Sequence, residues 1–242
     1  MNASNDYKNK SAGPIKAQAG FTLVEIAIVL VIIGLLLGGV LKGQELITSA
    51  RVRNLISQQD GVKAAYFGFL DRFRALPGDY SQAVGNIALV TTNGNGNGQI
   101  RSIAAADAAD EFILVWEHLS RAGFINGSYT YAAGAESPAS APTNPYARYI
   151  QVIYDAAYGT GTPAVRHNIK TGNQISSEIL AEIDRKVDDG NPVLGVFQFS
   201  VYPGGTGASA GPAPTGGLPG TCYNGTTWTA PTVPNCGGAS LL

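Results

Sequence analysis

The sequence has 242 residues, enough for an N-terminal tail, a membrane span and one domain of ordinary size. Its formal net charge is −1 and only 14% of its residues are Asp, Glu, Lys or Arg, so no basic surface indicates a nucleic-acid-binding protein. Low charge combined with 31 glycines suits an extracellular surface protein with long loops.

The first 20 residues are polar and carry three lysines against a single acid, Asp6. Residues 21–41 are almost entirely apolar and, as a helix, would be about 31 Å long, which matches the hydrocarbon thickness of a bilayer. The positive-inside rule keeps a basic N-terminus in the cytoplasm. We therefore expect residues 1–20 to be a basic leader, residues 21–45 to span the membrane, and residues 46–242 to form a head outside the cytoplasm.

Glu25 is the unusual residue of this span. A carboxylate in hydrocarbon is costly, so an acidic residue there normally has a partner or a function. The small residue Gly20 precedes the apolar segment, whereas an ordinary secretory peptide has small residues at the far end of a shorter core. Cleavage after Gly20 would therefore leave the helix on the mature protein. The alternative, an uncleaved single-pass anchor, leaves Glu25 unexplained.

Residues 20–25 have the sequence GFTLVE, and the apolar helix follows them directly. This pattern resembles the class III signal of type IV pilins and pilin-like proteins over about residues 16–45. The resemblance implies that a prepilin peptidase and N-methyltransferase cuts after Gly20 and methylates Phe21. It also implies that Glu25 pairs with the N-terminal amine of a neighbouring subunit, because buried charges are tolerable only when they are paired.

An amphipathic pattern continues beyond the span. Apolar residues recur at three- and four-residue spacing from Val52 to Leu76, with charged residues between them, and Pro77-Gly78-Asp79 ends the pattern. One helix from Phe21 to Leu76 is therefore expected. Its first half is apolar all round, and its second half carries a single apolar stripe for a globular head.

Four further elements are expected, each bounded by capping or turn residues. They are a helix from Asp107 to about Gly123, a strand within 147–155, a helix that begins at Ser176 or Ser177 and ends at Asp188-Asp189-Gly190, and a strand from Val193 to Tyr202. Together with the long helix they predict an α+β fold. The expected architecture is pilin-like, with the amphipathic half of the helix packed on a small, mainly antiparallel β-sheet.

Three asparagines in a glycine-rich segment, Asn93, Asn95 and Asn97, are spaced like the first ligands of a calcium loop. None of them carries a charge, and the twelfth position is Ala104 rather than Glu, so a plain glycine-rich turn is the simpler interpretation. A calcium site would need further acids, and the nearest are Asp107, Asp110 and Glu111. No cofactor other than this possible calcium is expected.

Other candidate chemistry is sparse. Asp184, Asp188 and Asp189 form an acidic cluster that is most simply explained as a solvated helix end. His118 and His167 are the only histidines, and His118 lies beside apolar residues of an expected helix, where packing is its simplest role. Neither histidine has a nucleophile or carboxylate at a spacing that suggests catalysis. The sequence therefore predicts a protein that is not an enzyme.

The only two cysteines, Cys222 and Cys236, lie near the C-terminal end. If the head is in an oxidising compartment, a disulfide is the default, and a loop of this length adds about 3 kcal/mol to the free energy of unfolding. Two free thiols or a metal pair are the alternatives. Many pilins resemble this arrangement, in which a disulfide bounds a C-terminal surface loop.

The leading hypothesis is a major or minor pilin of a type IV pilus-like filament. Its expected partners are the peptidase, other pilin subunits, an inner-membrane assembly platform and, before assembly, inner-membrane lipid, with no nucleic acid. The precursor would lie in the bacterial inner membrane and the assembled form in an extracellular or periplasmic filament. The alternatives are a pseudopilin of type II secretion and a membrane-anchored, adhesin-like binding module whose loops contact a ligand or calcium.

Overall fold

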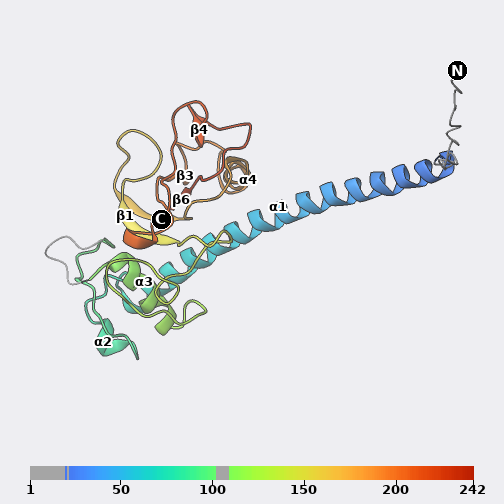
Figure 1. The fold of residues 1–242 in the computed structure, drawn as a ribbon. Coiled ribbons are helices and arrows are strands. Elements are labelled where there is room, and N and C mark those ends of the chain that lie inside the picture. Colours follow the sequence, from blue (N-terminus) through green and yellow to red (C-terminus); the bar gives the residue numbers. More distant parts are fainter. Residues whose placement is uncertain (1–19, 21, 102–108) are drawn as a thin grey trace, which may run out of the picture. The chain divides into compact units, whose positions relative to one another are not determined.

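The computed structural model describes residue 20 and residues 22–101 and 109–242, which form two compact units, Met1–Leu46 and Ile47–Leu242. The fold is α+β, as predicted, with a long apolar N-terminal helix and a small antiparallel sheet (Figure 1). The basic leader, Phe21 and the expected N-cap Asp107 lie outside the described residues.

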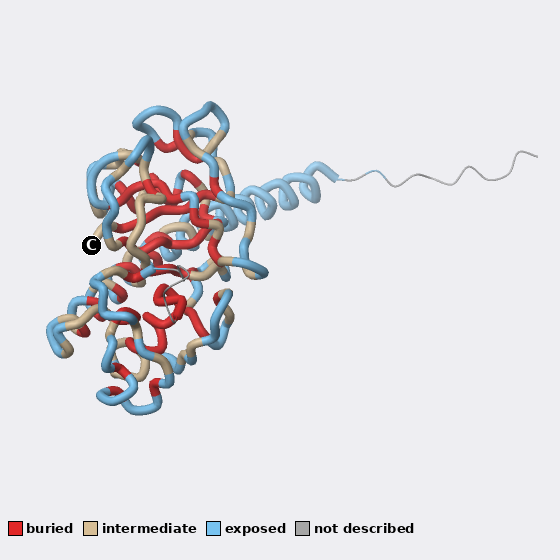
Figure 2. Tube along the Cα trace, turned by 90° about the vertical axis from the view of Figure 1, so that its left-hand side faces the viewer, coloured by how far each residue is buried: buried red, intermediate tan, exposed pale blue. Residues whose placement is uncertain are grey.

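Helix α1, Leu23–Phe73, has the two parts that the sequence predicts. Every residue from 22 to 42 is exposed (Figure 2). From Val52 to Phe69, buried residues recur every three or four positions, which places one stripe of the helix in the core of the second unit. The helix ends three residues before the expected Leu76, because Arg74 turns into the left-handed region with φ of 54°.

Three shorter helices follow α1: α2, Ala83–Asn86; α3, Glu111–Arg121; and α4, Ser177–Val187. Helix α4 begins after Ser176, as predicted, and α3 has Asp110 at its N-cap position. Gly123 has φ of 81° just beyond α3, so a glycine ends this helix as expected. One 3₁₀ turn, η1, lies at Gly207–Ser209.

The main sheet has four antiparallel strands in the order β1-β2-β6-β3. Their bounds are Gln151–Asp155 for β1, Arg166–Lys170 for β2, Gly238–Leu241 for β6 and Phe197–Phe199 for β3. A separate hairpin pairs β4, Tyr223–Asn224, with β5, Thr227–Trp228. The strand expected at Val193–Tyr202 is thus only three residues long, and the N–H groups at its start, those of Val196 and Phe197, donate to the Asp188 carboxylate.

Two hydrophobic clusters hold the second unit together. One joins the distal part of α1 to α3 and the sheet through Phe69, Trp116 and Ile169. The other joins Val52 and Leu55 of α1 to α4, β3 and the cysteine pair. Both clusters include residues of α1, so this helix packs against both parts of the core.

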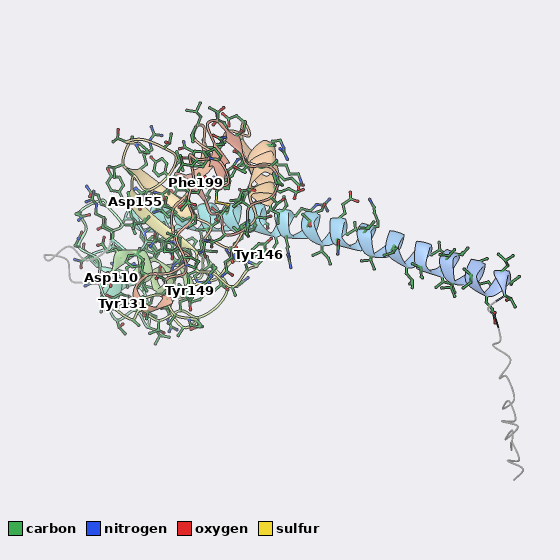
Figure 3. The ribbon with its side chains drawn as sticks, turned by 45° about the horizontal axis from the view of Figure 1, so that its top comes forward. Asp110, Tyr131, Tyr146, Tyr149, Asp155 and Phe199 are labelled. Carbon is green, nitrogen blue, oxygen red and sulfur yellow. A yellow bond between two sulfur atoms is a disulfide. The ribbon has the colours of Figure 1, made fainter. Side chains whose placement is uncertain are left out.

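The other face of the sheet is also buried but polar. Lys170 of β2 is 3% exposed and forms an ion pair with Asp155 of β1, whose place on the strand is labelled in Figure 3. Burial lowers the pKa of Lys170, and the charge of Asp155 opposes that shift. Nearby, Tyr202 donates a 2.6 Å hydrogen bond to Glu136, which fixes a surface loop over this face.

Candidate functional site

Thr22 and Glu25 form reciprocal hydrogen bonds where α1 begins. The backbone N–H and the hydroxyl of Thr22 each donate to Oε2 of Glu25 at 2.8 Å, and the N–H of Glu25 donates to Oγ1 of Thr22 at 3.3 Å. This is a capping box, which satisfies backbone donors at a helix N-terminus. The sequence predicted that the Glu25 carboxylate pairs with a neighbouring subunit. In the separate chain, this carboxylate already accepts hydrogen bonds from Thr22. The T-x-x-E spacing carried that signal, and our sequence interpretation missed it.

The helix surface around this box is apolar on every side. Glu25 is the only charged residue between Leu23 and Leu41, and α1 is long and apolar enough to cross a bilayer. The first charges after it, Lys42 and Glu45, form an exposed 2.7 Å ion pair. A helix that is apolar all round requires lipid or other protein surfaces to cover it.

Residues 15–41 match the family model described as the prokaryotic N-terminal methylation motif. The chain carries a prepilin-type signal. The resemblance to type IV pilins is thereby confirmed for this segment, and the motif points to a structural subunit that begins as a membrane-inserted precursor. No curated protein and no solved structure is significantly similar to the chain.

The predicted disulfide is present between Cys222 and Cys236. Cys236 and Ile175 also exchange two backbone hydrogen bonds, at 2.7 and 3.2 Å, and β6 begins two residues after Cys236. The covalent link therefore fixes the β4–β5 hairpin beside the start of a central strand. Thiol and metal-pair alternatives are excluded for these two residues.

The glycine-rich segment is a tightly bonded loop. The side-chain oxygens of Asn93, Asn95 and Asn97 accept backbone N–H groups from Val84, Asn97 and Gln99, at 2.8 to 2.9 Å. The bonds of Asn95 and Asn97 are Asx turns, whereas the bond of Asn93 reaches back to α2; together they account for the three asparagines without a metal. The plain glycine-rich turn stays the prediction here, and calcium binding stays the alternative.

Two buried carboxylates lie beneath this loop. Asp79 accepts the N–H groups of Asn97 at 2.9 Å and Gly98 at 2.8 Å, while Glu111 accepts those of Asn95 at 3.0 Å and Arg101 at 3.2 Å. Burial raises the pKa of Asp79, and the donated N–H groups oppose the shift. The loop is thus held by acids from outside it. The sequence named Glu111 only as a candidate calcium ligand and did not single out Asp79 as a partner of the loop.

The acidic cluster at the end of α4 differs from expectation. Asp188 is partly buried and Asp189 is exposed, but Asp184 is fully buried and is not part of a solvated helix end. Its carboxylate accepts the indole N–H of Trp228 at 2.8 Å and the N–H of Gly190 at 3.2 Å. The three carboxylates thus serve as hydrogen-bond acceptors for loops, and we assign them no metal.

His118 is buried, as predicted, and has a structural role. Its Nδ1 accepts the N–H of Gly78 at 2.9 Å, and its Nε2 lies 3.2 Å from the carbonyl oxygen of Thr92. This arrangement fits a neutral ring that donates from Nε2. Burial lowers the pKa of His118 to about 4 and that of His167 to about 4.

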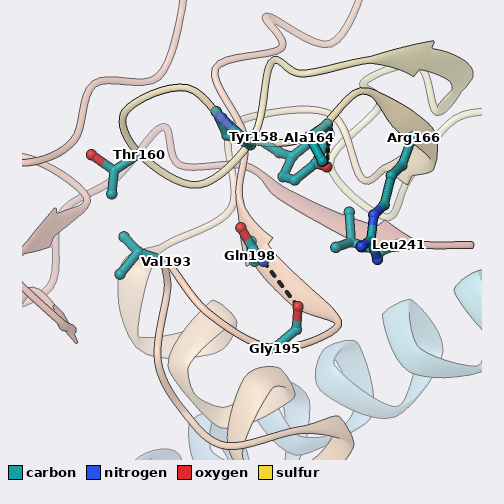
Figure 4. A pocket seen from close by; sticks show the side chains of 9 residues that line it. Tyr158, Thr160, Ala164, Arg166, Val193, Gly195, Gln198 and Leu241 are labelled. Atoms are coloured by element: carbon teal, nitrogen blue, oxygen red, sulfur yellow. Dashed lines mark hydrogen bonds between the residues drawn. The ribbon is translucent and has the colours of Figure 1, made fainter.

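A cavity of about 300 Å³ lies beside β2, β3 and β6 (Figure 4). At its centre, Gln198 donates a 2.9 Å hydrogen bond to the carbonyl oxygen of Gly195, and Arg166 stands at one side. The residues that line it include no histidine, cysteine or carboxylate. Its lining therefore offers no nucleophile with a base, and we assign no reaction to it.

Proposed function

We propose that this protein is a pilin-like filament subunit, processed at Gly20-Phe21 and assembled through the apolar part of α1, and that it is not an enzyme. The observation that carries the proposal is Glu25, a lone carboxylate at the start of an apolar helix within a methylation motif. Long loops and a C-terminal disulfide on a head of this size favour a pilus subunit over a pseudopilin of type II secretion.

Glu25 would change partner during assembly. In the separate chain its carboxylate accepts both donors of Thr22. In a filament, the same carboxylate would pair with the N-terminal amine of a neighbouring subunit. The capping box lowers the cost of keeping the carboxylate near hydrocarbon before that amine arrives.

Three variants separate capping from charge pairing. Glu25→Gln retains a side chain that can cap Thr22 but cannot form an ion pair, Glu25→Val removes both functions, and Thr22→Ala removes the hydroxyl and keeps the carboxylate. All three should insert in the membrane. We expect filament incorporation, measured by sheared-fibre blots, to fall strongly for both Glu25 variants and little for Thr22→Ala. Normal incorporation of Glu25→Gln would refute the pairing role.

Processing has its own test. We expect the mature chain to begin at Phe21 with a methylated amine, which the intact mass of membrane-extracted protein measures. Gly20→Val should leave the precursor uncut, because a branched side chain crowds the bond to be cleaved. A mature chain that begins at Met1 in wild-type cells would exclude the proposed processing and, with it, the assembly step.

A further inference from the structure

Five asparagines in this chain are followed by glycine: Asn93, Asn95, Asn97, Asn126 and Asn224. In such a pair the backbone nitrogen of the glycine can attack Cγ of the asparagine, because glycine has no side chain to hinder the approach. A succinimide ring forms as the side-chain nitrogen leaves as ammonia, carrying away the proton of the glycine amide. Water then opens the ring to aspartate or isoaspartate, so the only co-reactant is water.

Exposure does not distinguish the five sites, because all five asparagines are exposed. The attacking nitrogen is the distinguishing feature. To react, it must lose its proton and approach Cγ, and a hydrogen bond that holds its N–H in another direction opposes both steps. The five sites therefore differ in reactivity if the hydrogen bonding of their glycine N–H groups, or of the asparagine side chains themselves, differs.

The three glycine N–H groups of the loop are all engaged. Gly94 donates to the carbonyl oxygen of Tyr80 at 3.0 Å, Gly96 to the carbonyl oxygen of Asp79 at 2.8 Å, and Gly98 to the Asp79 carboxylate at 2.8 Å. These acceptors lie outside the loop. Succinimide formation here requires the loop to open first, which adds the free energy of local opening to the barrier.

The asparagine side chains of this loop are engaged as well. Asn95 and Asn97 each accept, through Oδ1, the N–H of the residue two positions later, at 2.9 and 2.8 Å. Oδ1 of Asn93 accepts the N–H of Val84 at 2.8 Å. Both reacting groups are therefore held at each of the three sites.

The other two sites lack these restraints. Gly225 follows Asn224 in the two-residue turn between β4 and β5, and Gly127 follows Asn126 in the loop after α3. Within the described part of the chain, neither glycine N–H makes a hydrogen bond, and neither asparagine side chain does. A free N–H beside a free side chain is the arrangement that the reaction requires.

We propose that Asn224 and Asn126 are sites of spontaneous deamidation in the folded protein, and that the loop from Asn93 to Asn97 is protected from it. Each conversion adds one negative charge. At Asn224 the new carboxylate lies in the disulfide-bounded segment, so the surface chemistry of this segment changes with the age of the protein. In the loop, a new carboxylate would instead lie above the buried acids Asp79 and Glu111 and would be repelled by them.

The test follows peptides of the detergent-extracted full chain during incubation in mildly alkaline buffer. Conversion raises the mass of a peptide by about 1 Da, and fragmentation assigns the residue. We expect Asn224 and Asn126 to convert at least about tenfold faster than Asn93, Asn95 or Asn97, because the loop must open before it reacts. Asn224→Gln should remove the signal at that site only.

The unfolded chain is the internal control. After reduction and in concentrated urea the hydrogen bonds are lost, so all five sites should convert at similar rates. Two results would overturn the proposal. One is a folded protein in which a loop asparagine converts as fast as Asn224, and the other is a folded protein in which Asn224 and Asn126 stay intact while the unfolded chain converts at all five sites.

Discussion

The indole Nε1 of Trp228 donates a 2.8 Å hydrogen bond to Oδ2 of Asp184, which joins the disulfide-bounded segment to helix α4. Asp184 is fully buried and Trp228 is 8% exposed. Burial raises the pKa of Asp184, and the hydrogen bond from Trp228 opposes this shift. A carboxylate inside the head thus depends on one side chain from a separate part of the chain.

Trp228→Phe both shrinks a buried ring and removes a hydrogen-bond donor from a buried carboxylate. Loss of the donor should lower the free energy of unfolding by about 1–3 kcal/mol beyond the cost of the smaller ring. Trp116→Phe is the matched control, since Trp116 is fully buried and its Nε1 has no hydrogen-bond partner among the described residues. Urea unfolding of the detergent-extracted protein measures both. Equal costs for the two variants would show that the bond to Asp184 contributes little.

Loss of the cysteine pair should destabilise the head. In the chain-entropy model, a loop of this length contributes about 3 kcal/mol, so we expect Cys222→Ser with Cys236→Ser to lower the free energy of unfolding by about 2–4 kcal/mol. Reduced and oxidised wild-type protein give an independent comparison by thermal unfolding. If reduction left the melting temperature unchanged, the backbone bonds between Cys236 and Ile175 would suffice to hold this segment.

Stability should fall on mild acidification because of His118. Its pKa is about 4 in the folded head and 6.5 in an unfolded chain. Between those values the unfolded chain binds a proton that the folded chain does not, so the free energy of unfolding decreases as the pH falls from 6.5 to about 4, by up to about 3 kcal/mol. Above pH 6.5 this contribution is constant.

A difference profile isolates this effect from other groups. Asp79 and Asp184 have raised pKa values and act in the opposite direction, and His167 acts in the same direction. At neutral pH the wild type should melt at a higher temperature than His118→Gln. This difference should shrink as the pH falls towards 4, because only the wild type loses the contribution of His118. Parallel curves across this range would mean that His118 does not titrate with folding.

Calcium should leave the melting temperature of the head unchanged. The loop asparagines carry no charge and their oxygens already accept backbone N–H groups, so they compensate poorly for dehydration of a divalent ion. Thermal unfolding with added calcium, and with magnesium as the control ion, measures any shift. A rise of several degrees that Asn95→Ala with Asn97→Ala abolishes would establish the site and strengthen the binding-module alternative.

Long periodic elements were predictable from the sequence, because their pattern is local. The apolar stripes of α1 and α4 depend on residues three or four positions apart. Strands β2 and β6 were missed for the opposite reason. The sequence RHNIK has little alternation and GASL has small side chains, so each becomes a strand only because a neighbouring strand pairs with it.

The candidate sites divide in the same way. The cysteine pair stands out in the sequence, and its predicted disulfide is present. Glu25 also stands out, as a carboxylate inside the matched motif, and its assembly role stays a prediction. The partners of the glycine-rich loop, Asp79 and Glu111, flank it in the sequence, and no local pattern says that their side chains reach back beneath it. Tertiary contacts of this kind need the fold before they can be recognised.

The position of β6 sets the order in which the head can form. Strands β1 and β2 can pair as a hairpin as soon as both have been synthesised, but among the described residues β3 joins the sheet only through β6, at residues 238–241. Until those residues arrive, one edge of β2 stays unpaired and the aromatic strand at Phe197–Phe199 has no neighbour in the sheet. Open edges of this kind pair readily with other chains. An incomplete head is therefore most prone to aggregate with other copies of the chain in the interval before β6 is synthesised.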